Sequence, residues 1–444
     1  MTPTSITDLV AAVRPLLTTV PLALARTCGF TRRARCLTAD VFCQSLVFGW
    51  LAQPDGSLEH LARTGAVAGA PVSAQAWHQR FGPAAAELLR GVLEAAVQQV
   101  VSGQSVPLPV LARFAAVLLV DSTTVALPAA LAHLWRGCGG GHQVSDGAAA
   151  LKVSVAYDLR GGRLWGLALA AGRTHDRAAA PPLDVPPGSL LIRDRGYFAL
   201  AALRGWNALG VHYLTRPQSN VTVFCAGQSW TFARLLGRRA RGAPLDMEVA
   251  LGTDEHLPLR LLAWRVPPAV CRQRRAALRK AAKKKVQPLS DHALAMAAWQ
   301  VLVTDLPPQR LSAAEAHTLY RARWQIELLF KVWKSEGGLA RSRSRQPQRV
   351  LCEVYAKLLA VLLAHWFLLT AGLWADPRRS LCKAFQHLKR LALALLMAFA
   401  EPARFGACLA GLAGQLRCGC RTNTRRKQPN TWQLLAAAGA ETLS

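Results

Sequence analysis

Strand-like segments between residues 115 and 215 constrain the fold of this chain more than any other feature. The run Ala115–Val120 is apolar and ends at Asp121, as expected of a short buried strand. The tripeptide Arg160-Gly161-Gly162 is a strong hairpin-turn signal between two further strands. Hairpin-joined strands followed by helix-linked strands predict a mixed α/β sheet rather than a doubly wound one. The other elements expected here are strands at 152–157, 164–171, 189–193 and 211–215, and a helix at 198–209.

The remaining sequence is expected to surround or interrupt this sheet. A strand at 300–304 and one long helix at 313–335 would complete it. Short β-like segments and a cationic run separate these two parts of the sheet, which indicates an insertion. The predicted segments are a helical N-terminal region (1–112), the first part of the sheet domain (113–215), a β-rich insertion with a basic helix (216–290), its completion (291–345) and a helical C-terminal region with a basic tail (346–444).

The charge of the chain indicates a polyanionic partner. The formal net charge is +29, with 54 Lys and Arg against 25 Asp and Glu. Such an excess, spread over the whole length, fits a phosphate backbone better than one small acidic ligand. The alternative is a generally basic soluble protein without a nucleic-acid partner.

Cysteine usage favours a reducing compartment for this chain. The eleven cysteines are scattered, and only Cys418 and Cys420 lie close in sequence, which is weak support for zinc and favours reduced cytosolic thiols.

The segment Leu358–Ala375 carries no Asp, Glu, Lys or Arg and reaches the short limit of a membrane span. A buried helix explains it better, so no membrane association is expected.

One helical stripe carries the residues with the clearest chemistry. Read at 3.6 residues per turn, five polar side chains fall along one side of residues 320–334. A single carboxylate among cations can reach a divalent metal while its neighbours hold phosphates. The five residues are Tyr320, Arg323, Glu327, Lys331 and Lys334.

Two aspartates could join Glu327 in a metal site. Asp121 and Asp194 each end an apolar strand, and neighbouring strands would place their carboxylates close together. Three such groups repel one another unless cations neutralise them, and oxygen-only ligation favours Mg²⁺ or Mn²⁺, with room for two ions. Taken singly, each aspartate could be a turn former, and Glu327 could be a salt-bridge partner on a helix surface.

Together these residues resemble a known family. The spacing Tyr320-x2-Arg323-x3-Glu327-x6-Lys334 resembles the Tyr-Arg-Glu-Lys signature of DDE-type transposases in the insertion-sequence-four group. The motif Asp194-Arg-Gly-Tyr-Phe198 resembles that group's second-aspartate motif, and Asp121-Ser-Thr123 resembles the first. The resemblance covers residues 115–345 well and the flanking regions only by position.

The resemblance implies roles for individual residues. It implies an RNase H-like core in which Asp121, Asp194 and Glu327 are the catalytic metal ligands. Tyr320, Arg323 and Lys334 would bind phosphates beside the cleaved end. Lys331, on the same helix stripe, is also expected to bind DNA. Trp299 is similar in position to an aromatic that stacks on an extruded base, although a buried strand tryptophan explains it equally well. The cationic run is expected to grip DNA or, alternatively, to form a solvated face; its selected residues are Arg274, Arg275, Lys283, Lys284 and Lys285.

The activity implied by the resemblance is cut-and-paste transposition of an insertion sequence. Double-stranded DNA would be cleaved at the terminal inverted repeats, and the freed 3′-hydroxyl joined to target DNA. A homodimer in the DNA complex, end recognition by the N-terminal helices and a cytoplasmic, nucleoid-associated location are expected with it. Two alternatives stay open: an RNase H-like nuclease without strand transfer, and an inactive DNA-binding remnant.

Overall fold

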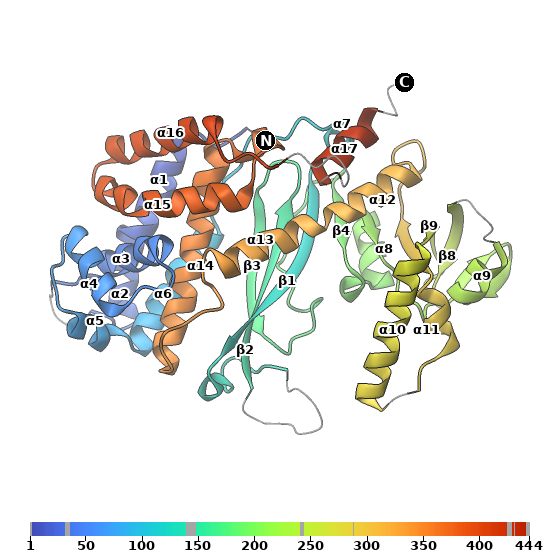
Figure 1. Cartoon of the computed structure of the whole chain (residues 1–444), viewed down its shortest axis with the longest axis horizontal. Helices are drawn as coiled ribbons and strands as arrows, with labels where there is room; N and C mark the ends of the chain where they lie inside the picture. The colour runs from blue at the N-terminus through green and yellow to red at the C-terminus, as the bar shows by residue number, and fades with distance from the viewer. Residues whose placement is uncertain are drawn as a thin grey trace. The chain divides into compact units, whose positions relative to one another are not determined.

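The computed structural model describes residues 2–31, 36–138, 148–239, 244–286, 288–423, 429 and 431–440. The chain forms two compact units (Figure 1), each assembled from three separate segments. The first unit contains residues 1–107, 122–183 and 325–428, and the second contains 108–121, 184–324 and 429–444. Most of the predicted basic tail, residues 424–428 and 430, lies outside the described residues.

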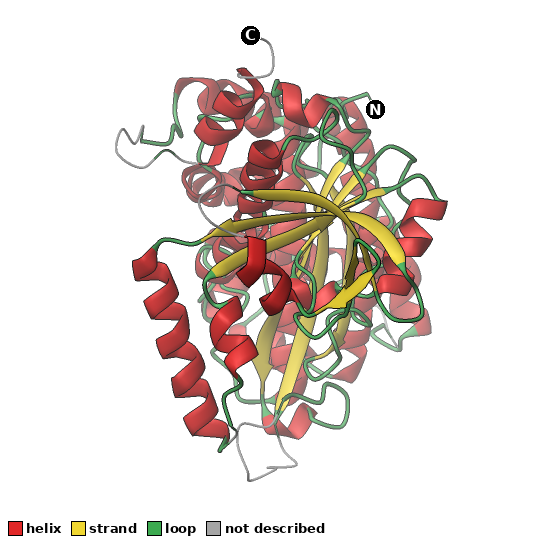
Figure 2. Ribbon diagram, turned by 90° about the vertical axis from the view of Figure 1, so that its right-hand side faces the viewer, coloured by secondary structure: helices red, strands yellow, loops and turns green. Residues whose placement is uncertain are grey.

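The second unit is built on a mixed sheet, which confirms the α/β prediction. Its hydrogen-bonded strand order is β1-β4-β5-β10-β9-β8-β6-β7. The pairs β1–β4 and β4–β5 are parallel, and the pairs from β5–β10 onward are antiparallel. The strands, yellow in Figure 2, are β1 (Val117–Leu127), β4 (Leu190–Arg193), β5 (His212–Thr215), β6 (Val223–Cys225), β7 (Gln228–Trp230), β8 (Leu245–Leu251), β9 (Leu257–Arg265) and β10 (Trp299–Thr304).

Several helices accompany this sheet. Apolar residues from the strands and from two of these helices form one buried cluster that includes Leu203, Phe232 and Leu261. The cluster holds the predicted insertion strands against β10, so the insertion extends the sheet instead of forming a separate one. The helices are α7 (Pro109–Ala112), α8 (Leu200–Ala208), α9 (Phe232–Arg239), α10 (Pro268–Lys285), α11 (Asp291–Met296), α12 (Ala313–Ala322) and α17 (Thr431–Ala440), with a 3-10 turn, η2 (Arg195–Tyr197), after β4.

The first unit combines a β-hairpin with a large helical layer. β2 (Ala149–Asp158) and β3 (Leu164–Ala171) pair in antiparallel fashion around the predicted turn, and β2 neighbours β1. The turn is held by the Asp158 carboxylate, which accepts hydrogen bonds from the backbone amides of Arg160 and Gly161. The helices are α1 (Ile6–Leu17), α2 (Thr19–Thr27), α3 (Ala39–Ala52), α4 (Leu58–Val67), α5 (Ala74–Arg80), α6 (Pro83–Val97), α13 (Trp324–Ser335), α14 (Pro347–Thr370), α15 (Leu381–Phe399) and α16 (Pro402–Cys418), with short 3-10 turns η1 (Ala129–Leu131) and η3 (Leu373–Ala375).

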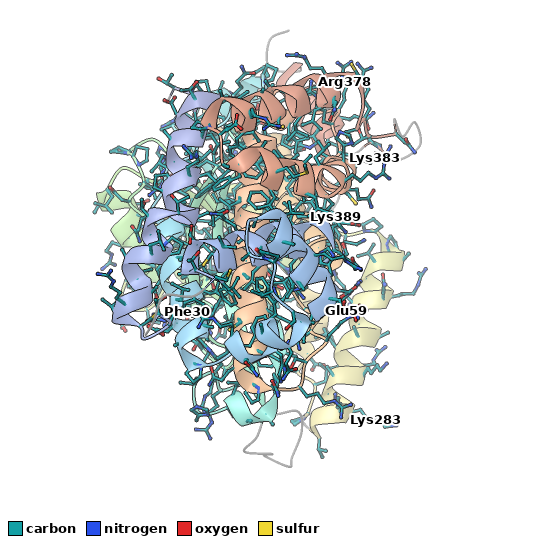
Figure 3. All side chains as sticks on the ribbon, turned by 90° about the vertical axis from the view of Figure 1, so that its left-hand side faces the viewer. Phe30, Glu59, Lys283, Arg378, Lys383 and Lys389 are labelled. Carbon is teal, nitrogen blue, oxygen red and sulfur yellow. The ribbon has the colours of Figure 1, made fainter. Side chains whose placement is uncertain are left out.

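Helix α14 forms the centre of this helical layer. It contacts α3 and α6, and every residue from Val350 to Leu369 is buried. Two helical stretches, Ile6–Thr27 and Pro347–Thr370, are long and apolar enough to cross a membrane by length and composition alone. The apolar window of Pro347–Thr370 is completely buried in the protein, as in the core helix of a soluble fold. By contrast, Arg378 and Lys383 near the start of α15 are exposed (Figure 3).

Two predicted elements differ from those observed. The first strand does not end at Asp121 but continues to Leu127, because Ser122, Thr123 and Thr124 are compatible with an extended pleated backbone. The predicted helix 313–335 is two helices, since α12 ends at Ala322 and α13 begins at Trp324. Arg323 lies at the break, where its amide bonds back only three residues.

Candidate active site

The register of two parallel strands aligns the predicted aspartates. Val120 of β1 is paired with Arg193 of β4, so Asp121 and Asp194 are the next residues along neighbouring strands. Adjacent strands lie about 4.8 Å apart. Asp121, within β1, and Asp194, directly after the end of β4, therefore occupy neighbouring positions, where their like charges need a cation for compensation.

Arg323 supplies a cation to the first of these carboxylates. Its Nη1 lies 2.8 Å from Asp121 Oδ2, and the two side chains are 18% and 23% exposed. The break after α12 accounts for this position. Arg323 caps α12, and its amide donates to the Tyr320 carbonyl at 3.2 Å, a 3-10-type bond that tightens the last turn.

Tyr320 contacts the second carboxylate. Its hydroxyl donates a hydrogen bond of 3.0 Å to Asp194 Oδ1. Burial alone would raise the pKa of Asp194, but the Arg195 amide, the charges of Arg323 and Arg216, and this hydroxyl together hold that pKa below its ordinary value. Burial beside the same carboxylate raises the pKa of Tyr320, so the phenol remains a donor. The sequence-predicted residues Asp121, Asp194, Tyr320 and Arg323 therefore meet in one unit.

A cavity of about 520 Å³ opens in the same unit. Its walls include Arg195, Arg216 and Arg274 together with the ring of Trp299. Trp299 is only 5% exposed, and the Arg265 guanidinium lies 4.8 Å from its ring centroid. The cavity combines cationic and apolar walls, which suits an anionic ligand that carries an aromatic group.

The cationic residues of α10 divide into two groups. Arg274 Nη1 donates to the Trp299 carbonyl at 3.0 Å, and Arg275 Nε donates to the Leu294 carbonyl at 3.1 Å. These two guanidiniums hold α10 against the sheet and α11. Lys283 and Lys284 are exposed. The side chain of Lys285, also predicted to bind DNA, lies outside the described residues.

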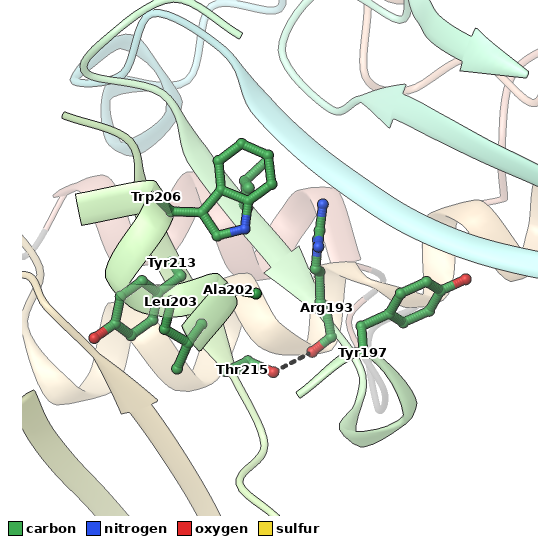
Figure 4. A pocket seen from close by; sticks show the side chains of 8 residues that line it. Arg193, Tyr197, Ala202, Leu203, Trp206, Tyr213 and Thr215 are labelled. Atoms are coloured by element: carbon green, nitrogen blue, oxygen red, sulfur yellow. Dashed lines mark hydrogen bonds between the residues drawn. The ribbon is translucent and has the colours of Figure 1, made fainter. Parts of the chain in front are cut away.

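A second, much smaller cavity is lined in part by residues of β4, the strand that directly precedes Asp194. Its volume is about 10 Å³, roughly one water-sized space. In Figure 4 the Arg193 side chain lies between the rings of Tyr197 and Trp206, whose centroids are 5.9 and 5.1 Å from its guanidinium carbon. Burial lowers the pKa of Arg193 to about 10. The Thr215 hydroxyl donates to the Arg193 carbonyl at 3.1 Å, so β4 is fixed just before Asp194.

Comparison with known proteins assigns the family. The model for the "Transposase DDE domain" matches residues 112–363, more than half of the chain. The chain belongs to the DDE transposase family. The matched range includes both aligned aspartates and the segment that carries Tyr320, Arg323 and Glu327.

Named relatives of this DDE transposase chain are transposases of insertion sequences. The transposase for insertion sequence element IS231F from Bacillus thuringiensis subsp. israelensis is 27% identical over 364 residues, which cover 77% of this chain and 75% of the relative. The transposase for IS1151 from Clostridium perfringens is 23% identical over 278 residues, 58% of each chain. A shorter stretch of 106 residues is 34% identical to the putative transposase InsL for IS186A from Escherichia coli (strain K12), covering 24% of this chain and 29% of the relative.

The other predicted residues of this DDE transposase chain lie on α13 in the first unit. Glu327 and Lys334 are partly exposed there, and Lys331 is exposed. Burial lowers the pKa of Lys334. Within the described ranges, no three His, Cys, Asp or Glu side chains are gathered closely enough to hold a metal ion. The three-carboxylate site expected from the sequence therefore remains a proposal.

Two features of the transposase chain were not selected from its sequence. Trp324, directly after Arg323, is 54% exposed, which is unusual for so large an apolar side chain. In the first unit, Lys152 Nζ lies 2.7 Å from Asp176 Oδ1, which also accepts from the Ser122 hydroxyl at 3.0 Å. A lysine inside the apolar strand Ala149–Asp158 was the available signal for this pair.

Proposed function

We propose that this chain is a metal-dependent DNA transposase of the insertion-sequence-four group with an RNase H-like core. The observation that carries the proposal is the pairing of two acids, at neighbouring positions of the parallel strands β1 and β4, with two signature residues. Asp121 and Asp194 leave adjacent parallel strands in register, and Arg323 and Tyr320 contact them. Two acids on neighbouring strands beside a cationic helix suit metal-assisted phosphoryl transfer on DNA.

Asp121, Asp194 and Glu327 are the proposed catalytic ligands of two Mg²⁺ or Mn²⁺ ions. The residues fit such ions, because their donors are carboxylate oxygens alone and Asp121 already accepts a cation at 2.8 Å. When bound, the ions would activate the attacking water or 3′-hydroxyl and stabilise the leaving oxygen.

The neighbouring residues would orient the DNA. Arg323, Lys331 and Lys334 would bind phosphates, and the Tyr320 hydroxyl would donate to a phosphate or to Asp194. Exposed Trp324 is suited to stack on a base next to the cleaved bond. The cavity beside Trp299 would receive a nucleotide, with Arg195, Arg216 and Arg274 facing its phosphate.

The wider assembly follows from the same proposal. The N-terminal helices would recognise the terminal inverted repeats, and the exposed face of α10, including Lys283 and Lys284, would hold duplex DNA. Two DNA ends must be joined to one target, so a homodimer is expected in the DNA complex. The chain would act on DNA in the cytoplasm, associated with the nucleoid, and without a membrane.

A cleavage and joining assay tests this function. Labelled DNA carrying the element's ends is incubated with a supercoiled target plasmid and Mg²⁺, and cut and joined products are separated on gels. Wild-type chain is expected to give both products, and Glu327→Ala neither, while Glu327→Ala still shifts the labelled DNA. Cut ends without joined product would favour the nuclease alternative, and unchanged products from Glu327→Ala would contradict the catalytic assignment.

A further inference from the structure

The contact between Arg323 and Asp121 joins a proposed phosphate ligand to a proposed metal ligand. Arg323 Nη1 lies 2.8 Å from Asp121 Oδ2, although the residues are 202 positions apart. The pair is only partly buried, so both groups remain within reach of ions and DNA. One guanidinium thus contacts a carboxylate that a divalent cation also needs.

A guanidinium and a dication compete at one carboxylate. A cation bound to Asp121 and Asp194 would lie within a few ångströms of the Arg323 charge, and like charges at that distance repel strongly in a partly buried site. The cation is therefore bound more tightly when the guanidinium moves away from the aspartates.

A DNA phosphate offers the guanidinium another partner. The planar fork of arginine matches two phosphate oxygens as well as it matches a carboxylate. Arg323 stands at the break between α12 and α13, where the regular helical hydrogen bond is replaced by a three-residue bond. A backbone that is not locked in a helix can change its dihedral angles at lower cost than one inside it.

We propose that Arg323 alternates between Asp121 and a DNA phosphate and thereby couples divalent-cation binding to DNA binding. This inference rests on the proposed function of the site. Phosphate binding draws the guanidinium from Asp121 and raises affinity for the cation. By linkage, the cation raises affinity for DNA by the same factor. The cation and the DNA are thus retained together more tightly than either is alone.

Tyr320 provides a natural internal comparison. Its hydroxyl contacts Asp194 as Arg323 contacts Asp121, but a phenol brings no positive charge to the carboxylate. Removing this hydroxyl takes a hydrogen bond from Asp194 without removing a positive charge. If charge competition is the operative effect, Tyr320→Phe should change cation affinity much less than Arg323→Gln.

Direct cation binding to the full chain tests the proposal. Free Mn²⁺ is measured by electron paramagnetic resonance for wild type, Arg323→Gln, Arg323→Lys, Tyr320→Phe and, as the matched control, Arg321→Gln on the exposed neighbouring position. Without DNA, Arg323→Gln is expected to bind Mn²⁺ about tenfold more tightly than wild type. Tyr320→Phe and Arg321→Gln should stay within about threefold of wild type, and Arg323→Lys, which keeps the charge, should bind more weakly than Arg323→Gln. Unchanged or weaker Mn²⁺ binding by Arg323→Gln, with native circular dichroism, would overturn the proposal.

The coupling itself is measured with DNA. A short blunt duplex oligonucleotide is titrated with each chain in Ca²⁺ and in EDTA, so that affinity is read without cleavage. The gain in affinity on adding Ca²⁺ should be larger for wild type and Arg321→Gln than for Arg323→Gln. Equal gains in all three chains would overturn the coupling. Failure of the proposed metal site has a separate signature, since Asp121→Asn and Asp194→Asn would then bind Mn²⁺ as wild type does.

Discussion

Each unit contains a carboxylate paired with a cation, and the two pairs differ in what surrounds them. Asp121 belongs to β1, and Asp176 accepts a hydrogen bond from Ser122 of the same strand. Lys152 is 10% exposed and donates to the Thr174 carbonyl as well as to Asp176, while the Ser122 hydroxyl donates to Asp176. In the second unit, Asp121 contacts Arg323 but has a second acid, Asp194, on the next strand. The first pair joins one acid to one ammonium, whereas the second places two acids on neighbouring strands beside Arg323.

This difference separates a structural pair from a site that acts on a ligand. Burial would raise the pKa of Asp176, but Lys152 and Ser122 outweigh it and hold that pKa below its ordinary value. Every partner named there belongs to a strand or to the loop after β3. Two acids side by side are unfavourable for folding and are retained where a ligand compensates them. The comparison predicts that substitutions in the Lys152–Asp176 pair lower mainly stability. Substitution of Asp194 should lower mainly DNA cleavage.

The largest expected effect is on catalysis. Asp194→Asn should lower DNA cleavage by about a thousandfold or more, because a proposed metal ligand is lost. Asp176→Asn, the matched change in the structural pair, should keep cleavage within about fivefold of wild type. Gel assays of labelled ends in Mg²⁺ measure both. Similar losses of DNA cleavage in the two variants would mean that Asp176 and Asp194 do not differ in role.

A smaller effect is expected on stability. Lys152→Met should lower the free energy of unfolding by about 1–3 kcal/mol, since it leaves Asp176 and the Thr174 carbonyl without their ammonium. The loss falls below that of a fully buried pair because Asp176 is 39% exposed. Urea unfolding followed by circular dichroism gives the value, with Lys152→Arg as the charge-conserving control. A loss below about 0.5 kcal/mol would mean that the pair is not structural.

The contrast between structural and ligand-binding side chains also applies to the cationic residues of α10. Lys283→Gln with Lys284→Gln should weaken duplex binding about tenfold at low salt and reduce the salt dependence by about two phosphate contacts. Arg275→Gln should instead lower stability, because its guanidinium donates to the Leu294 carbonyl. Fluorescence anisotropy at several salt concentrations separates these outcomes. An unchanged salt slope in the double variant would show that these lysines do not contact DNA.

The smallest expected effect concerns pH. Since the folded pKa of Asp176 is depressed, its contribution to stability is present above the unfolded pKa of about 4 and is lost as pH falls through the folded value. Wild type should therefore exceed Asp176→Asn in stability at neutral pH, and this advantage should shrink below about pH 4. Unfolding curves at neutral pH and at about pH 3 test it. A stability advantage of wild type that grows in acid would mean that folding raises the pKa of Asp176 instead of lowering it.

Much of the sheet could be predicted from sequence because its signals are local. Apolar runs and the Arg160-Gly-Gly162 turn indicated strands and a hairpin close to those observed. The break at Arg323 could not be found this way, since residues 313–335 have helical periodicity throughout and the Asp121 contact spans 202 positions. The sequence pattern aligned five polar residues on one stripe, but the structure links two of them to different strands.

The hydrogen-bond partners of the cationic residues could not be predicted from the sequence pattern either. Arg274 and Arg275 look like solvated cations in a basic run, yet their guanidiniums donate to main-chain carbonyls of other segments. The sequence pattern assigned Trp324 neither to the core nor to the site. Only the structure shows that this side chain is exposed. Local spacing identifies which face of a helix a residue occupies, but not which distant segment that face meets.

The last helix has a consequence for how this protein is made. α17 packs on α7 and α12 of the second unit, with Leu435 fully buried, although it follows the long helical stretch of the first unit in the chain. During synthesis, the segment holding Tyr320 and Arg323 leaves the ribosome about a hundred residues before its packing partner, at roughly 5–20 residues per second. Nascent chains must therefore spend several seconds with the α12 surface uncovered, a period in which chaperones could bind it.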